Sequence, residues 1–335
     1  MPRLRAGICS AMTASVLEKL HSAGVVDVFD FVSHDLDILA TKTDVGYREL
    51  AAVRRALISE HAAPVIAGSQ LFDVVVATTS IVSLGSGVLD SLLGGGLFTC
   101  EITEVVTDRS VHANSLVMNT VLSVVTSMSK NVVFIDTSNH FDASNLAAMM
   151  ASRNDVDIET ALKRVRVIKC FTVLELLGHL SKLCEATSQS IDPFYSSLKL
   201  IVIDGIVDHI MPSLAHIHNN YGCGYVAQLS HQFRLLTTDF CYALLLCNGN
   251  GLVKTSAASK LSLVGKLWCS IPDTRLEVEG IVGENKEQNN TDSRMLSGRV
   301  KVTLSKSNRL PIAQRVELNV DEWGLFAGGK ELSSN

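Results

Sequence analysis

The segment from Leu92 to Ser115 constrains the fold more than any other part of this chain. It contains a glycine turn (Gly94 to Gly96), a short apolar strand predicted from Glu101 to Val106, a loop, and a helix that begins near Asn114. A strand, loop and helix in this order form the place where an α/β domain binds a nucleoside triphosphate. In such a site the loop supplies backbone N–H groups, glycines and a lysine for the phosphates.

The loop of this segment carries almost none of that chemistry. No glycine and no lysine occurs in it, and its residues are Thr107, Asp108, Arg109, Ser110, Val111, His112, Ala113 and Asn114. Asp108 adds a negative charge next to where phosphates would lie, and like charges repel. The segment is therefore either a phosphate site that has lost its chemistry or a site that never bound phosphate.

From Ile81 onward the pattern predicts an α/β domain with a mainly parallel sheet. The strands are apolar runs without alternation, as in a parallel sheet that helices cover on both faces. Buried strands are expected at Glu101 to Val106, Asn131 to Asp136, Val165 to Lys169, Leu198 to Asp204 and Tyr242 to Cys247. Helices are expected at Ser115 to Met128, Asp142 to Ala151, Val173 to Thr187 and Tyr225 to Thr238, and further β-structure at Arg275 to Val282, Gly298 to Ser305 and Arg315 to Val320.

Residues 1–60 are predicted to form a small helical domain. Its clearest helix runs from Tyr47 to Ile58, with apolar residues on one face and arginines on the other. The glycine-containing stretch HSAGVVDVFDF, between short helices, resembles a helix–hairpin–helix. Such a module either holds a nucleic-acid backbone through loop N–H groups or serves as a plain interaction module, and the near-neutral charge favours the second.

Residues 61–80 differ in character from the residues on either side. Pro64 and Gly68 break helices, and the remaining residues are apolar and suit an extended chain. The segment is predicted to be a linker that is able to pair with the edge of a neighbouring sheet. The alternative is an ordinary first strand of the main domain, residues 81–335.

Composition narrows the class of protein. The hydrophobic fraction of 47% supports a large core, and the net charge of −5 argues against a protein that coats nucleic acid. No apolar run has the character of a membrane span or a signal peptide, so an intracellular protein is expected. The eight cysteines form no CxxC pair and are expected to be reduced thiols. His216 and His218 have no further ligand at metal spacing and are expected to face solvent.

Two aspartates end predicted strands. Asp204 follows LKLIVI, where a phosphate-loop enzyme places the carboxylate that orders magnesium and its water; alternatively it caps the next loop. Asp136 ends VVFID, and a hydrolytic enzyme would need a carboxylate two positions further on to polarise the attacking water. Ser138 stands there, and a hydroxyl cannot act as that base at neutral pH.

The order of these motifs resembles the RecA/Rad recombinase family of eukaryotes, and within it one of the paralogue branches. The segments that carry the resemblance are LGSGVLDSLLGGGLFTCEITEV, VVFIDTSN, KLIVIDG, ALLLCNGN, GKLWCSIPDTRL and LSKSNRLP, in that order. LRAGICSAMT, DFVSHDLDILA and ELAAVRRALI extend it toward the N-terminus, so the resemblance spans essentially the whole chain.

This resemblance implies a helical N-terminal domain, a linker and a RecA-type core of the kind that hydrolyses ATP with magnesium. It implies a nuclear protein of homologous recombination, crosslink repair and telomere maintenance. It also implies partners: other recombinase paralogues, contacted through linker 61–80 and faces of the core, and single-stranded DNA, reached through the complex that assists the main recombinase.

The departures from the family concern nucleotide handling. Where the family's loop reads GGPGSGKT, Ala113 has the position of the phosphate-binding lysine and Asn114 that of the magnesium-binding hydroxyl. Gly249 stands where the recombinase carries a glutamine that senses the γ-phosphate. Loss of the lysine removes roughly 1.5–3 kcal/mol of ATP-binding free energy. Each β-carbon in the phosphate-binding loop lowers the binding free energy by about 1 kcal/mol more. An ATP site with a micromolar dissociation constant would weaken to around millimolar. Arg109 and His112 compensate for the lost lysine only in part, because they stand at other positions of the loop.

The resemblance places the family's second DNA-binding loop after Asn248. Lys254, Lys260 and Lys266 in that loop are candidates to follow a phosphate backbone, although no aromatic residue is present for base stacking. The alternative is a flexible solvated loop. The segment after Asp204, which would be the first DNA loop, begins without lysine or arginine, and little is expected of it.

We therefore expect a RecA-type scaffold in which residues 107–114 are a degenerate phosphate loop and Asp204 is a vestigial magnesium ligand. No catalytic residue is assigned, and ATP binding is expected to be weak or absent. The function expected is that of a non-catalytic recombinase paralogue, and the alternative is an active DNA-dependent ATPase with an atypical loop. A gene-model error across the loop is disfavoured because strand and helix resume in register.

Overall fold

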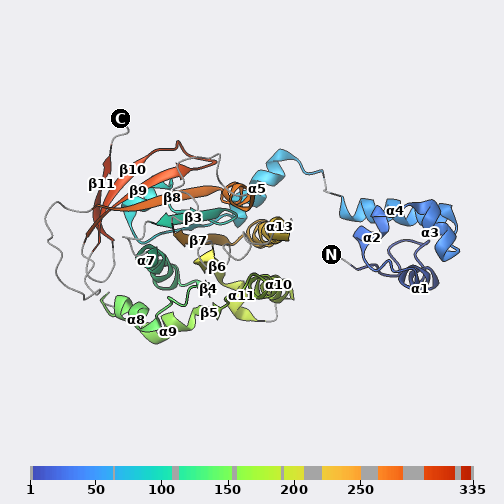
Figure 1. Ribbon diagram of the computed structural model, residues 1–335, viewed down its shortest axis with the longest axis horizontal. Helices are drawn as coiled ribbons and strands as arrows, with labels where there is room; N and C mark the ends of the chain where they lie inside the picture. Colours follow the sequence, from blue (N-terminus) through green and yellow to red (C-terminus); the bar gives the residue numbers. More distant parts are fainter. Residues whose placement is uncertain are drawn as a thin grey trace. The chain divides into compact units, whose positions relative to one another are not determined.

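The fold is described from a computed structural model of the chain. It describes residues 3–62, 65–107, 113–152, 157–189, 192–206, 221–249, 263–281, 298–320 and 326–332, without the side chains of 113, 114, 221, 263–266 and 326–332. The chain divides into two compact units, Met1–Val74 and Val75–Asn335 (Figure 1). None of the helices in the described part of the chain has the length and apolar character that crossing a bilayer requires.

The first unit contains a small helical domain, as the sequence predicts. Short polar side chains start three of its helices: Thr13, Asp27 and Asp35 each accept a backbone N–H from the first turn. Leu20, Phe31 and other fully buried residues form its core. The helices are α1 (Ala14–Ser22), α2 (Val28–Ser33), α3 (Leu36–Thr43) and α4 (Tyr47–His61).

The expectation that residues 61–80 are extended is wrong for most of the segment. Helix α5 occupies Gly68–Thr78, and none of its residues is buried. Gly68 begins this helix instead of breaking one. A strand needs a partner to satisfy its backbone N–H and C=O groups, whereas a helix satisfies them within the segment itself. The apolar run LFDVVVAT adopts a helix, and among the described strands none pairs with it.

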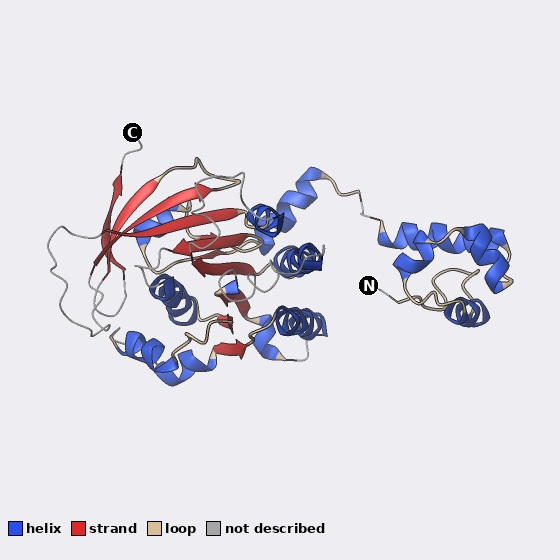
Figure 2. Cartoon of the chain, in the orientation of Figure 1, coloured by secondary structure: helices blue, strands red, loops and turns tan. Residues whose placement is uncertain are grey.

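The second unit is built on a mixed sheet, mostly parallel, which confirms the α/β prediction. Within the described residues the sheet has nine strands in the order β11-β10-β9-β8-β3-β7-β6-β4-β5. Figure 2 shows the strands in red and the helices in blue. Strands from β8 to β5 pair in parallel, and those from β8 to β11 pair antiparallel. The strands are β3 (Ile102–Thr107), β4 (Asn131–Asp136), β5 (Val165–Lys169), β6 (Leu198–Asp204), β7 (Ala243–Gly249), β8 (Thr274–Ile281), β9 (Gly298–Lys306), β10 (Arg315–Val320) and β11 (Phe326–Leu332).

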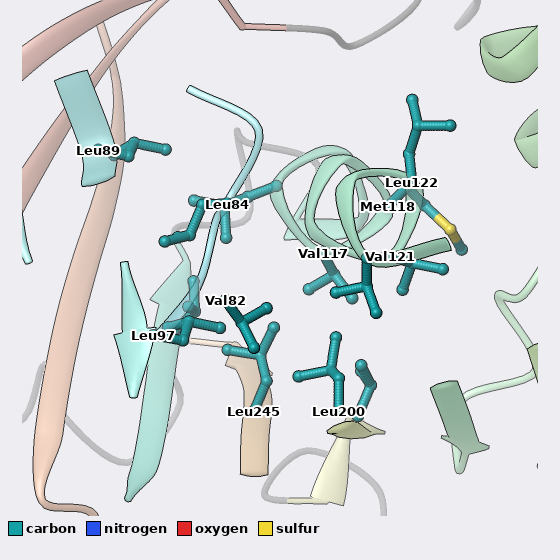
Figure 3. Packing of buried hydrophobic residues seen from close by; sticks show 14 of the residues in the cluster. Val82, Leu84, Leu89, Leu97, Val117, Met118, Val121, Leu122, Leu200 and Leu245 are labelled. Carbon is teal, nitrogen blue, oxygen red and sulfur yellow. The ribbon is translucent and has the colours of Figure 1, made fainter. Parts of the chain in front are cut away.

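Helices cover both faces of the parallel part of this sheet. Successive residues of a strand point to opposite faces, so Phe134 belongs to one core cluster and Ile135 to the other. Figure 3 shows Val117 and Val121 of α7 directed toward Leu200 of β6 and Leu245 of β7. The helices are α6 (Gly87–Leu92), α7 (Ala113–Thr126), α8 (Ala143–Ala151), α9 (Ile158–Lys163), α10 (Val173–Gln189), α11 (Pro193–Ser196), α13 (Tyr221–Arg234), which continues as the π-helix η2 (Leu235–Asp239), and α14 (Leu263–Ser270).

The glycine turn of the opening segment lies directly before a short hairpin strand. Gly94, Gly95 and Gly96 all have positive φ, at 71°, 126° and 136°. A β-carbon on Gly96 would lie 2.5 Å from the carbonyl oxygen of Val82, so only glycine fits there. The turn thereby lets β2 (Leu97–Phe98) pair with β1 (Ile81–Val82), next to the start of β3.

Two further differences from the sequence prediction concern the borders of the sheet. Strand β5 is at one edge and is largely accessible, so the expectation that Val165 to Lys169 is buried is wrong; an edge strand has a neighbour on one side only. Strand β11 and helices α9 and α14 are not predicted from the sequence, because each is short or follows a polar, charged loop.

Candidate nucleotide-binding site

The carboxyl ends of β3, β4, β6 and β7 meet at one edge of the sheet because these strands are parallel. Asp136 of β4 lies opposite Asp204 of β6, and Thr107 of β3 lies opposite Gly249 of β7. Open parallel sheets bind ligands at this edge. The topology therefore brings Asp136, Ser138 and Asp204, separated by up to 68 residues in the chain (204 − 136), into one cluster.

Asp136 is fully buried, and its side chain forms hydrogen bonds with the backbone that follows β4. Its carboxylate accepts the N–H groups of Ser138 at 3.1 Å, His140 at 3.2 Å and Phe141 at 3.1 Å. These bonds hold the turn that follows β4. A carboxylate with three N–H donors is already satisfied, so Asp136 shapes the site instead of offering a free ligand.

Asp204 is also buried, and it is bonded to Ser138. The Ser138 hydroxyl donates to Asp204 Oδ2 at 2.7 Å and lies 3.3 Å from Asp136 Oδ1. Burial raises the pKa of Asp204 above its ordinary value, and the Ser138 hydrogen bond and the nearby His140 partly oppose this effect. The strand end is fixed further by Thr137, whose hydroxyl donates to the carbonyl oxygen of Asp204 at 2.6 Å.

The cluster places a serine where a hydrolytic magnesium–nucleotide site would need a carboxylate. Asp204 is an oxygen ligand of the type that magnesium prefers. The position from which a carboxylate would polarise the attacking water holds Ser138, whose hydroxyl is directed at Asp204. In the described part of the chain no group of three or more histidine, cysteine, aspartate or glutamate side chains is arranged to hold a metal ion.

The structure describes only part of the predicted loop. Thr107 is buried at the end of β3, and its hydroxyl lies 3.4 Å from the carbonyl oxygen of Asn248. Ala113 and Asn114 begin helix α7, close to the helix start expected from the sequence. The other loop positions lie outside the described residues: Asp108, Arg109, Ser110, Val111 and His112. Their roles remain predictions.

Most of the candidate histidine and lysine residues also lie outside the described part of the chain. His216, His218, Lys254 and Lys260 lie outside the described residues, and Lys266 is in helix α14 with its side chain not described. The proposed DNA contacts of the three lysines therefore stay predictions. None of the eight cysteines, all of which lie within the described residues, forms a disulfide.

One buried charged residue next to this site is missed by sequence reasoning. Glu104 lies in the middle of β3, is 1% exposed, and accepts bonds from Asn248 Nδ2 and Trp268 Nε1, both at 2.8 Å. Asn248 is the penultimate residue of β7, and Trp268 is in α14. A glutamate inside the apolar run ITEVV is the available signal, because a buried charge requires partners.

Comparisons with known proteins agree with this geometry. A family model described as Rad51 matches residues 76–248, and one described as RAD51D, N-terminal domain, matches residues 1–60. DNA repair protein RAD51 homolog 4 of Bos taurus is 30% identical over 310 residues, 92% of each chain. The mouse protein of the same name is 26% identical over 334 residues, 99% of this chain and 98% of its own.

A solved structure shares the fold. The crystal structure of the RadB recombinase superposes with a TM-score of 0.57 and 18% identity, covering 73% of this chain and 98% of its own. At that identity the likeness speaks for the fold alone. Together with the parallel sheet and its flanking helices, it shows a RecA-type architecture.

Proposed function

This chain belongs to the Rad51 family, and we propose that it acts in homologous recombination and DNA repair as a non-catalytic paralogue. In this role it is a structural subunit of a complex of recombinase paralogues. The complex assists the main recombinase on single-stranded DNA in the nucleus. The names of its relatives, DNA repair protein RAD51 homolog 4, support the place in repair.

The observation that carries the non-catalytic part is the bond between Ser138 and Asp204. The hydroxyl sits 2.7 Å from the carboxylate that would order magnesium, at the position where a hydrolytic enzyme needs a base. The chain also has Ala113 in place of the phosphate-binding lysine and no glycine from 107 to 114. We infer that ATP binds weakly or not at all, with Asp204 as a vestigial magnesium ligand.

A photo-crosslinking ATP analogue tests this inference on the full-length chain bound to its partner paralogue. Such a probe reports on the polypeptide that it labels, so binding by the partner does not confuse the result. We expect no labelling of this chain at micromolar analogue. The double variant Ala113→Lys, Asn114→Thr should gain labelling, because it restores a charge-assisted phosphate contact worth roughly 1.5–3 kcal/mol.

An active ATPase with an atypical loop is the second candidate. Its support is that Asp136 and Asp204 both keep their places at the carboxyl edge of the sheet. Under this alternative the unaltered chain would be labelled at micromolar analogue, and Asp204→Ala would abolish the labelling. That result would overturn the non-catalytic proposal.

Exposed apolar surface supports the role in assembly. Phe72 on α5 is 66% exposed, and Val65 and Ile66, which precede this helix, are exposed as well. At one edge of the sheet, β5 leaves one side without a strand partner in the described residues. We infer that neighbouring paralogues contact residues 61–80 and the edge of the core, because such surfaces favour protein partners.

Co-purification with the neighbouring paralogue tests the assembly surface. We expect Phe72→Ser to lower recovery of the partner at least tenfold, because a large exposed aromatic at an interface is a typical hot spot. Ile312→Ser is the matched control: Ile312 is 60% exposed and lies outside residues 61–80. Equal recovery with both variants would remove residues 61–80 from the interface.

Binding of single-stranded DNA is proposed for the complex, with Lys254, Lys260 and Lys266 as the contributions of this chain. Three phosphate contacts should steepen the plot of log binding constant against log salt concentration by about two units of slope, compared with a complex that lacks them. A triple Lys→Ala variant in the assembled complex tests this. An unchanged slope would remove these lysines from the DNA contact.

A further inference from the structure

Two cysteines meet at the edge of the sheet opposite to the candidate nucleotide site. Cys100 lies two residues before β3 and Cys241 lies two residues before β7, and these strands are parallel neighbours. The Cys100 N–H donates to the carbonyl oxygen of Tyr242 at 3.0 Å, and the Leu244 N–H donates to that of Glu101 at 3.2 Å. Cys241 therefore directly precedes the residue that is bonded to Cys100.

The backbone at both cysteines is unusual. Cys100 has φ of 69° and Cys241 has φ of 53°, in the left-handed region that residues other than glycine seldom adopt. Both residues are partly accessible, whereas Cys170 and Cys247 are buried. The pair is thus within reach of small molecules in solvent, and each left-handed turn redirects the chain just before its strand.

The two thiols interact with each other. Burial, followed by a hydrogen bond with Cys241, raises the pKa of Cys100 to about 11, while the charge of Lys199 on β6 acts in the opposite direction. The Cys100 thiol therefore keeps its proton at neutral pH. The Cys241 thiol donates to the carbonyl oxygen of Thr238 at 3.8 Å. The two thiols therefore lie next to each other where the chain enters β3 and β7.

We propose that Cys100 and Cys241 form a redox-modification site, in which a hydroperoxide converts the two thiols into a reversible disulfide. Strands spaced about 4.8 Å apart and the backbone bond from Cys100 to Tyr242, the neighbour of Cys241, bring the two cysteines close to the Cα separation of about 4.4–6.8 Å that a disulfide spans. No large movement of the sheet is required. In a reducing compartment the pair rests as two thiols and closes only when oxidant is present.

The chemistry balances with hydrogen peroxide as oxidant. The Cys241 sulfur attacks one peroxide oxygen as its proton is released, so an S–O bond forms, the O–O bond breaks, and the leaving hydroxide takes up that proton as the first water. The Cys100 sulfur then attacks the Cys241 sulfur, so the S–S bond forms and the S–O bond breaks. The departing hydroxide takes up the Cys100 proton as water. In sum, two thiols and one peroxide give one disulfide and two waters.

Thiol mapping on the unaltered full-length chain tests the proposal. The protein is treated with low hydrogen peroxide, remaining thiols are alkylated, and peptides are identified by mass spectrometry. We expect a linked peptide pair containing Cys100 and Cys241, lighter by two hydrogens and split by dithiothreitol, while Cys184 is recovered alkylated. Recovery of both Cys100 and Cys241 as alkylated thiols, or links to other cysteines, would overturn the proposal.

Single variants assign the roles of the two thiols. In Cys100→Ser, Cys241 should accumulate sulfenic acid that a dimedone probe traps, because the resolving thiol is gone. In Cys241→Ser, trapping at Cys100 should be at least tenfold lower. Cys184→Ser, at a half-buried helix position, should keep the disulfide of the unaltered chain. Equal trapping at Cys100 and Cys241 would contradict the ordered pair.

Discussion

Glu104 and Arg275 form a buried ion pair between neighbouring strands, with Arg275 Nε 2.6 Å from Glu104 Oε2. The two residues lie directly opposite each other in the parallel pairing of β3 and β8. The second carboxylate oxygen accepts the bonds from Asn248 and Trp268. A single carboxylate thereby connects β3 with β7, α14 and β8.

Removing the charge of Glu104 should destabilise the core unit strongly. Glu104→Gln keeps the shape but leaves the Arg275 guanidinium buried without its counter-charge, which costs about 3 kcal/mol or more. Urea unfolding followed by tryptophan fluorescence measures the loss. Glu159→Gln is the control, because its partner Lys163 and Glu159 itself are exposed and such pairs contribute little. Equal losses in the two variants would show that burial of the pair is energetically unimportant.

The best-predicted elements are those whose formation depends mainly on residues adjacent in the sequence. The strands Asn131–Asp136 and Leu198–Asp204 coincide with the prediction because unbroken β-branched and aliphatic runs of this length suit a strand covered on both faces. Helix α5 was beyond such reasoning, since whether an apolar run is a strand or a helix depends on the presence of a partner strand. The same dependence on neighbours explains why β5 matches in its bounds but not in its burial.

The candidate site was predictable in its residues but not in its contacts. Ser138 and Asp204 are singled out by the strands that they follow, yet their hydrogen bond joins positions 66 residues apart. The Glu104–Arg275 pair spans 171 residues. No local sequence pattern indicates which arginine forms the ion pair with a buried glutamate. Long-range pairing of this kind follows from strand order, which a single sequence does not specify.

The stability of the core unit should fall as pH rises through the titration of Asp204. Its pKa in the folded chain is raised above the ordinary 3.8, so between the two values the folded state binds more protons than the unfolded state. Stability in that window therefore decreases with increasing pH. Unfolding free energies from urea titrations between pH 4 and pH 8, a range set around this carboxyl's ordinary value and neutrality, should show this decrease.

A variant separates Asp204 from the other carboxylates. Asp204→Asn cannot ionise but still accepts a bond from Ser138, so the difference between it and the unaltered chain should follow the Asp204 titration alone. Asp73→Asn, at an exposed position on α5, is the matched control for the loss of one carboxylate. A profile of Asp204→Asn that runs parallel to that of the unaltered chain would show that Asp204 does not titrate in this window.

The glycine turn should tolerate no side chain at Gly96. Gly96→Ala places a β-carbon 2.5 Å from the Val82 carbonyl oxygen, in a backbone region with φ of 136°. The free energy of unfolding should fall by about 1–3 kcal/mol. Gly178→Ala is the opposite control, since nothing lies within 4 Å of that position and alanine favours a helix by about 1 kcal/mol. Similar effects in both variants would contradict the geometry of the turn.

The accessible edge strand gives a prediction about assembly that is independent of α5. Val167 on β5 is 37% exposed, and Phe171 and Leu174, which follow it, are exposed at 56% and 63%. An extended segment of a partner that adds to this edge would bury these apolar side chains and satisfy the free backbone groups. Val167→Lys places a charge at the edge, which disfavours strand addition.

We therefore expect Val167→Lys to lower co-purification of the neighbouring paralogue at least tenfold without a change in the urea midpoint, because the side chain is accessible in the isolated chain. Arg166→Ala is a matched change on the same strand: its guanidinium stacks 3.9 Å from the Phe194 ring and pairs with Asp192 inside this chain. It should alter stability slightly and leave partner recovery intact. If Val167→Lys retains the partner fully, assembly must use residues 61–80 or another face of the core, and the edge of β5 is excluded.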